Sequence, residues 1–118
     1  MIIGGVAGGA STAARLRRLD EQAEIILFEK GEYISYANCG LPYYIGGVIE
    51  ERERLFVQTP ESFKARFNIE VRIKSEVKAI EPENKQVVIK DWATGKTYRE
   101  SFDKLVLSPG AEPVLPPW

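Results

Sequence analysis

A glycine-rich segment near the start of the chain, residues 4–9 with the sequence GGVAGG, restricts the possible fold more than any other feature. It follows the apolar run Met1–Ile3 and precedes Ser11–Asp20, which is rich in the good helix formers alanine, leucine and arginine. The β-branched and aromatic run Glu24–Glu29 comes next and is typical of a buried strand. Strand, glycine loop, helix and a strand ending at an acidic residue, within about thirty residues, form the pattern of a βαβ dinucleotide-binding unit. The order predicts an α/β fold.

Each position of this unit has its own physical role. Gly4 allows a tight turn after the first strand, and Gly9 allows the helix to pack closely on that strand. The helix N-terminus and the backbone N–H groups of the loop would face a pyrophosphate. Glu29 lies twenty residues past Gly9, where its carboxylate would accept hydrogen bonds from a ribose diol. Val6 occupies the middle glycine position of G-x-G-x-x-G, and a glycine-rich turn without a ligand is the alternative interpretation.

The predicted helix has two contrasting faces. A small or apolar face, expected to lie on the sheet, is formed by Gly9, Ala13, Leu16 and Leu19. A polar stripe on the roughly opposite face is formed by Ser11, Arg15 and Arg18. Spacing alone favours a solvated surface for the stripe and leaves a phosphate- or anion-binding stripe as the other hypothesis.

The single cysteine, Cys39, lies in the segment Asn38-Cys39-Gly40-Leu41-Pro42. Proline suits the first turn of a helix, so we expect Cys39 just before a helix N-terminus, where the dipole and free N–H groups favour a thiolate. A lone cysteine is more often a small buried residue, but few structural cysteines lie among Asn, Gly and Pro at a helix start.

The composition limits the available chemistry. Lys+Arg total 16 and Asp+Glu 17, and the formal charge of −1 gives no general attraction to nucleic acid or anionic lipid. We find no membrane-spanning run and no signal-peptide pattern, and we expect a cytoplasmic protein that binds neither nucleic acid nor membrane. One cysteine and no histidine exclude an internal disulfide, a Cys-cluster metal site and a His-based triad.

The rest of the chain alternates between strands and breaks. The charged run Glu50–Arg54 predicts a solvated loop or helical turn, and Thr59 is the expected N-cap of a short helix that ends at Phe67. A strand at Glu70–Lys74, a three-stranded meander and a buried final strand should follow. The meander strands and the final strand are Val77–Ile80, Gln86–Lys90, Lys96–Phe102 and Lys104–Leu107.

The segment Ser35–Gly47, together with the glycine loop and Phe28-Glu29-Lys30, resembles the N-terminal part of FAD-dependent pyridine nucleotide-disulfide oxidoreductases. It is most similar to the single-cysteine branch of coenzyme A-disulfide reductases and related persulfide or polysulfide reductases. The resemblance covers essentially all 118 residues. It implies a three-layer, Rossmann-like FAD-binding domain with a parallel sheet and an inserted antiparallel meander. Cys39 would be the redox-active nucleophile, cycling through a mixed disulfide with coenzyme A.

The same resemblance implies the remaining site residues and partners. The residues that would bind FAD are Gly4, Gly5, Val6, Ala7, Gly8, Gly9, Glu29, Lys30, Val77, Ser108 and Gly110. The residues that would bind coenzyme A, its disulfide or its persulfide are Ser11, Arg15, Arg18, Ser35 and Asn38. NAD(P)H would be the electron donor of the full-length parent, which would be a homodimer.

Two departures separate the branches of the family. Tyr44 stands where two-cysteine reductases have their second cysteine, so an internal cysteine pair is impossible. Ala7 stands where NADH peroxidases and oxidases usually have a histidine, which argues against peroxide or oxygen as the main substrate. An NADH oxidase or peroxidase working through a Cys39 sulfenic acid, and a non-catalytic nucleotide-binding module, are the alternatives.

Relatives in this family are several hundred residues long, and the sequence contains one glycine-rich nucleotide loop. We therefore expect residues 1–118 to be a truncated N-terminal segment of a discontinuous FAD-binding domain. The NAD(P)H and dimerisation domains would be absent, and this segment alone should be inactive.

Overall fold

The computed structural model describes residues 1–118. Its main sheet is parallel and has the strand order β3-β2-β1-β7. The strands are β1 (Ile2–Ile3), β2 (Ile26–Phe28), β3 (Glu70–Arg72) and β7 (Val106–Leu107). In register, Ile2 lies opposite Leu27 of β2 and Val106 of β7, so β1 is a central strand.

A separate antiparallel sheet forms the predicted meander. It contains β4 (Ser75–Glu81), β5 (Gln86–Asp91) and β6 (Thr97–Ser101), in the order β4-β5-β6. Val77 pairs with Ile89 and Ala79 with Val88, so a bulge at this point bends β4. The three-stranded meander is confirmed.

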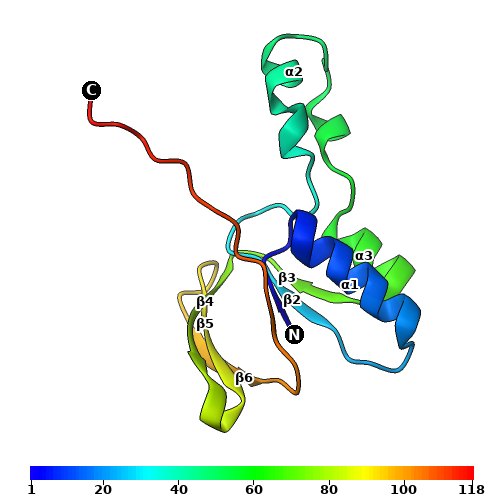
Figure 1. Ribbon diagram of the computed structural model, residues 1–118, viewed down its shortest axis with the longest axis vertical. Coiled ribbons are helices and arrows are strands. Elements are labelled where there is room, and N and C mark those ends of the chain that lie inside the picture. Colours follow the sequence, from blue (N-terminus) through cyan, green and yellow to red (C-terminus); the bar gives the residue numbers. More distant parts are fainter.

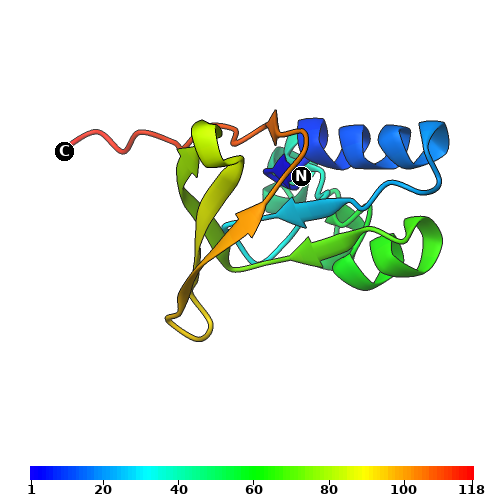
Figure 2. The same ribbon diagram turned by 90° about the horizontal axis from the view of Figure 1, so that it is seen from below.

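The two sheets and the helices form three layers. Ile25 and Leu27 point toward a cluster that includes Ala13 of α1 (Ala7–Leu19) and Phe63 of α3 (Pro60–Phe67). Ile26 and Phe28 point the other way, into a cluster with Val87 and Ile89 of β5. In Figure 1, α1 and α3 lie on one side of β2 and β3, and the meander lies on the other; Figure 2 shows the same separation. Because β2 is covered on both faces, its residues are apolar without alternation. The predicted Rossmann-like fold class is confirmed.

The short helix α3 begins where the sequence predicts. Thr59 is its N-cap, and its hydroxyl accepts a hydrogen bond from the Ser62 N–H at 3.1 Å, while the Ser62 hydroxyl accepts one from the Thr59 N–H at 2.9 Å. At the other end, Arg17 of α1 donates hydrogen bonds to the carbonyls of Phe67 and Asn68, at 2.7 and 3.0 Å. Arg17 therefore joins the two helices through the carbonyl end of α3.

Two predictions about α1 are wrong. The helix begins at Ala7 rather than Ser11, so half of the glycine-rich segment forms its first turn. Leu16 and Leu19 were expected on the buried face but are 39% and 66% exposed. The face that packs on the sheet is made of Gly9, Ala10 and Ala13, which are small enough for the helix to lie close to the strand. Beyond this close contact, Leu16 borders a surface cavity that is also lined by Met1, the residue before β1 begins.

The final strand also differs from its prediction. Lys104–Leu107 was expected to be a buried strand, but β7 contains only Val106 and Leu107, and Leu107 is 58% exposed. The reason is its position at the edge of the sheet, where only β1 pairs with it. None of the helices is both long and apolar enough to cross a membrane.

The cysteine segment projects from the layered body. Residues 36–56 form an excursion that contains a 3₁₀ turn (Asn38–Gly40), α2 (Leu41–Ile45) and a second 3₁₀ turn (Arg52–Leu55). A further 3₁₀ turn, Pro82–Asn84, joins β4 to β5. Figure 1 shows α2 held away from both sheets, at the end of this excursion. The charged run Glu50–Arg54 lies on it, and all of its side chains are exposed as predicted.

Candidate functional site

The glycine loop is packed so tightly that two of its glycines allow no side chain. Gly4 has φ +97°, and a Cβ atom placed on it would overlap the carbonyl oxygen of Ser108. A Cβ atom on Gly9 would overlap the carbonyl oxygen of Gly4. The predicted turn at Gly4 and the predicted close helix packing at Gly9 are confirmed.

Glu29 is fixed at the carboxyl end of β2 by two backbone groups. Its Oε2 accepts a hydrogen bond from the Gly5 N–H at 2.7 Å, and its Oε1 accepts one from the Gly31 N–H at 3.0 Å. A carboxylate has about four acceptor positions, so about two remain for a ligand. The sequence predicted that the backbone N–H groups of the loop face a pyrophosphate. The Gly5 N–H departs from this prediction, because it is bonded to the Glu29 carboxylate. Gly5 itself is buried under Ile34 and Leu27, where a Cβ atom would lie 2.6 and 2.9 Å from their side chains.

A cavity of about 310 Å³ opens beside Glu29, at the carboxyl ends of β1 and β2. This edge of a parallel sheet is where α/β folds bind nucleotides. Five residues predicted to bind the cofactor lie together in its lining: Gly4, Glu29, Lys30, Val77 and Gly110. Gly4, Glu29 and Lys30 directly follow β1 and β2, Val77 lies in β4, and Gly110 lies after β7.

The remaining residues predicted to bind the cofactor lie around the first turn of α1. Ser108 contacts this turn, because a Cβ atom on Gly8 would lie 3.0 Å from the Ser108 hydroxyl. Ala7 and Gly8 are exposed there, and Gly9 is buried. Val6 is the N-cap of α1 and makes no side-chain capping bond; it borders a different cavity, which Glu29 also lines.

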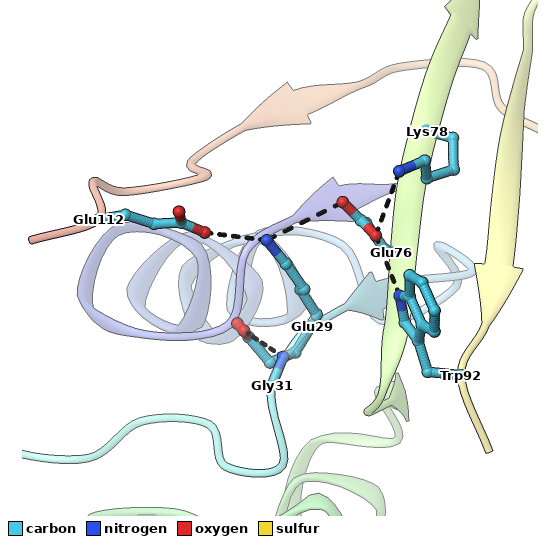
Figure 3. Close-up of polar contacts among 7 residues, drawn as sticks. Glu29, Gly31, Glu76, Lys78, Trp92 and Glu112 are labelled. Atoms are coloured by element: carbon cyan, nitrogen blue, oxygen red, sulfur yellow. Dashed lines mark hydrogen bonds and ion pairs between the residues drawn. The ribbon is translucent and has the colours of Figure 1, made fainter.

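Sequence reasoning missed two carboxylates of this cavity, those of Glu76 and Glu112. The Lys30 ammonium donates a hydrogen bond to Glu112 at 2.9 Å and lies 3.9 Å from Glu76 (Figure 3). The hydrogen bond with Glu112 raises the pKa of Lys30, and Lys30 lowers the pKa of Glu112. The Trp92 indole N–H, 3.0 Å away, is the main cause that lowers the pKa of Glu76, with Lys78 and Lys30 adding to it. No local pattern could reveal the contact of Lys30 with Glu112, since 82 positions separate them.

Cys39 is exposed within the 3₁₀ turn that leads into α2, and Pro42 is in the first turn of that helix. The predicted position just before a helix start is confirmed. The segment that precedes Cys39 is attached to the glycine loop, because the Ser35 N–H donates to the Gly5 carbonyl at 2.8 Å. Ser35 has φ +48°, so the chain turns sharply at this contact. Gly5 thus bonds to Glu29 through its N–H and to the cysteine segment through its carbonyl.

The polar stripe of α1 is solvent-exposed. Ser11, Arg15 and Arg18 are all exposed, and Asn38 is exposed beside Cys39, while Ser35 is half-buried. Arg17, between two members of the stripe, is instead used inside the protein to hold α3. This exposure fits both the solvated-surface and the anion-binding hypotheses.

Comparisons with known proteins agree with this arrangement. The whole chain, residues 1–118, matches the family described as pyridine nucleotide-disulphide oxidoreductase. A coenzyme A disulfide reductase from Staphylococcus epidermidis is 48% identical over 111 residues, which are 94% of this chain and 25% of the relative. The chain therefore spans about a quarter of the length of the curated relatives it matches.

Solved structures give the same result. The reduced CoADR-RHD of Bacillus anthracis has a TM-score of 0.95 and 60% identity, over 98% of this chain and 21% of that protein. An NAD-dependent persulfide reductase from A. fulgidus has a TM-score of 0.92 and 38% identity, over 98% and 22%. A water-forming NADH oxidase from Lactobacillus brevis is more distant, with a TM-score of 0.91 and 29% identity over 98% and 25%. With its Rossmann-like layers and its match over the full length, this chain belongs to the pyridine nucleotide-disulphide oxidoreductase family.

Proposed function

We propose that this chain is the N-terminal segment of the FAD-binding domain of a cytoplasmic, homodimeric enzyme. That enzyme reduces coenzyme A disulfide, or a related persulfide or polysulfide, with electrons from NAD(P)H. The observation that carries the proposal is the position of Cys39, exposed on a turn whose preceding segment is bonded through Gly5 to Glu29. The names of the coenzyme A disulfide reductase and persulfide reductase relatives support the substrate class.

The residues present fit FAD. Glu29 keeps free acceptor positions beside the cavity, as the two hydroxyls of an adenosine ribose require. Three carboxylates and one ammonium line that cavity, which suits a neutral sugar and base better than a phosphate: Glu29, Glu76, Glu112 and Lys30. The phosphates would instead lie at the exposed first turn of α1, where Ala7 and Gly8 present backbone N–H groups.

Cys39 would act by thiol–disulfide exchange. Its thiolate attacks one sulfur of the substrate disulfide, a new bond forms between Cys39 Sγ and that sulfur, and the original S–S bond breaks. The first coenzyme A leaves as a thiolate with the electron pair of the broken bond. FAD, when bound, supplies the two-electron relay from NAD(P)H that returns the mixed disulfide to thiolate and thiol.

The exposed stripe of α1 would hold the phosphate end of the substrate. Arg15 and Arg18 carry planar guanidinium groups that bind phosphate oxygens in pairs, and Ser11 adds a hydroxyl. Ser35 and Asn38 flank the cysteine and would contact the thiol end. A ligand with phosphates at one end and sulfur at the other is what coenzyme A provides.

The proposal is tested on the full-length parent, purified without reductant. Mass spectrometry of the peptide that contains Cys39 should find it bonded to coenzyme A, and a reductant should release about one coenzyme A for each Cys39. A water-forming oxidase is the second candidate, because an NADH oxidase is among the structural neighbours. In that case dimedone would trap Cys39 as a sulfenic acid and no coenzyme A would be released, which would contradict the first proposal.

A further inference from the structure

The excursion that carries Cys39 has almost no core of its own. Among residues 36–56 only Gly40 and Leu55 are buried, and Leu55 is 4% exposed. Gly40 directly follows the exposed Cys39, so the turn has one residue in solvent and the next one packed inside.

Gly40 is packed against Leu55 with no space left between them. A Cβ atom placed on Gly40 would lie 2.9 Å from Leu55 Cδ2 and 3.5 Å from Ile49 Cδ1. The backbone of Gly40 is ordinary, with φ −84° and ψ −11°, so any residue could adopt it. A larger residue at this position would therefore require the buried Leu55 side chain to shift, and the backbone conformation gives no other reason for a glycine.

Leu55 is in turn fixed to the body of the protein. Its carbonyl accepts a hydrogen bond from the Ala37 N–H at 2.6 Å, and the ring of the next residue, Phe56, packs against Tyr33 at a tilt of 38° with ring centroids 4.9 Å apart. Arg52 lies over both rings, at 5.2 and 5.9 Å from their centroids. These contacts close the neck of the excursion directly beneath the cysteine turn.

We infer that Leu55 is a positioning residue for Cys39: through its contact with Gly40 it sets how far the cysteine turn stands out from the neck. The inference rests on the proposed function, in which Cys39 is the nucleophile. It adds that the reactivity of the thiol depends on a leucine sixteen positions later in the chain, directly after a charged run that the sequence indicates to be solvent-exposed.

The test compares Gly40→Ala, Leu55→Ala and the double variant in the full-length parent. The readout is the rate at which iodoacetamide alkylates Cys39, followed by mass spectrometry of its peptide, with flavin content as a control for folding. Gly40→Ala and Leu55→Ala should each change the rate by about tenfold, and the double variant should return to within about threefold of the parent, since the methyl group added at one position fills the space left at the other. Val48→Ala, at an exposed position of the same excursion, should leave the rate unchanged.

Independent effects in the double variant, or a normal rate in Leu55→Ala, would overturn the inference. If Gly40→Ala does not retain flavin, Leu55→Ala and the conservative Leu55→Met decide: alanine should change the rate and methionine should restore it. Alkylation does not require turnover, so this result is separate from the proposed function. If Cys39→Ser keeps full disulfide reduction, the proposed function fails even where Leu55 controls the thiol.

Discussion

The Glu29 carboxylate accepts a hydrogen bond from the Gly5 N–H at 2.7 Å, so the acidic residue that ends β2 holds the glycine loop that follows β1. The Gly5 carbonyl accepts a bond from Ser35 in the cysteine segment at 2.8 Å. One peptide segment therefore connects the expected ribose-binding carboxylate with the expected nucleophile. A substitution at Glu29 should therefore affect both the ribose-binding position and the position of the cysteine segment.

Substitution Glu29→Gln in the full-length parent should weaken FAD binding. The neutral amide loses the charge-assisted bonds to the ribose hydroxyls and to Gly5, which costs about 1.5–3 kcal/mol, or about 10- to 150-fold in the dissociation constant. Flavin absorbance after dialysis, and titration of the apoprotein with FAD, measure the change. Glu83→Gln, at an exposed position beside the meander, is the matched control. Equal FAD affinity in the two variants would remove Glu29 from the cofactor site.

Substitution Gly9→Ala should destabilise the fold. The added methyl would overlap the Gly4 carbonyl and lie 3.2 Å from Ile2, so α1 must move off the sheet, at a cost of about 1–3 kcal/mol. Urea unfolding followed by circular dichroism measures the loss. Gly31→Ala is the control, because its methyl would lie at an ordinary 3.5 Å from the Glu29 carboxylate and its φ is not positive. A midpoint for Gly9→Ala as high as that of Gly31→Ala would contradict the close packing.

Sequence reasoning predicts best where the determinant is local. The roles of Gly4 and Gly9, the N-cap Thr59 and the alternation of the meander depend on neighbours along the chain or on one face of an element, and the structure confirms them. The position of Cys39 before α2 could be predicted for the same reason, from Pro42.

The parts that sequence reasoning missed depend on partners far along the chain. Leu16 fits the period of the buried face, but its exposure depends on where the short strand β1 begins. Lys30 meets Glu112 only because β7 returns the chain beside β1. Leu55 follows a run of charged residues, so its burial under Gly40 could be known only from the closed neck of the excursion.

The pairing of Lys30 with Glu112 predicts a pH effect with a definite sign. The pKa of Glu112 is lowered from 4.5, so the pair stabilises the fold above about pH 4.5, and that contribution is lost as the pH falls through the lower pKa of the folded state. In Lys30→Met the pKa of Glu112 should rise toward 4.5, as measured by NMR titration of the glutamate Cδ signals. Glu81, whose pKa is lowered by Arg99, should titrate as before and serves as the internal control. An unchanged Glu112 titration would mean that the segment after β7 is not held by Lys30.

The KM values of an Arg18 variant for different substrates distinguish the two explanations for the exposed stripe of α1, a phosphate-binding site and a solvated surface. If Arg18 binds a phosphate of coenzyme A, Arg18→Ala in the full-length parent should raise KM for coenzyme A disulfide by about tenfold or more, through the loss of a charge-assisted pair. The KM for polysulfide or an uncharged disulfide should stay nearly constant, because these substrates have no phosphate for the guanidinium to hold. Lys96→Ala, which removes an exposed charge on the meander, controls for the general loss of positive charge.

The same pair of variants also distinguishes binding from long-range attraction. General attraction would weaken with salt and would respond to Lys96 as well as to Arg18, whereas a direct contact responds to Arg18 alone. Equal changes in KM for charged and uncharged substrates in Arg18→Ala would mean that the stripe is only a solvated surface. The phosphate end of the substrate would then have to be held by other residues, while the assignment of Cys39 would be unaffected, because that assignment rests on the turn before α2 and not on the stripe.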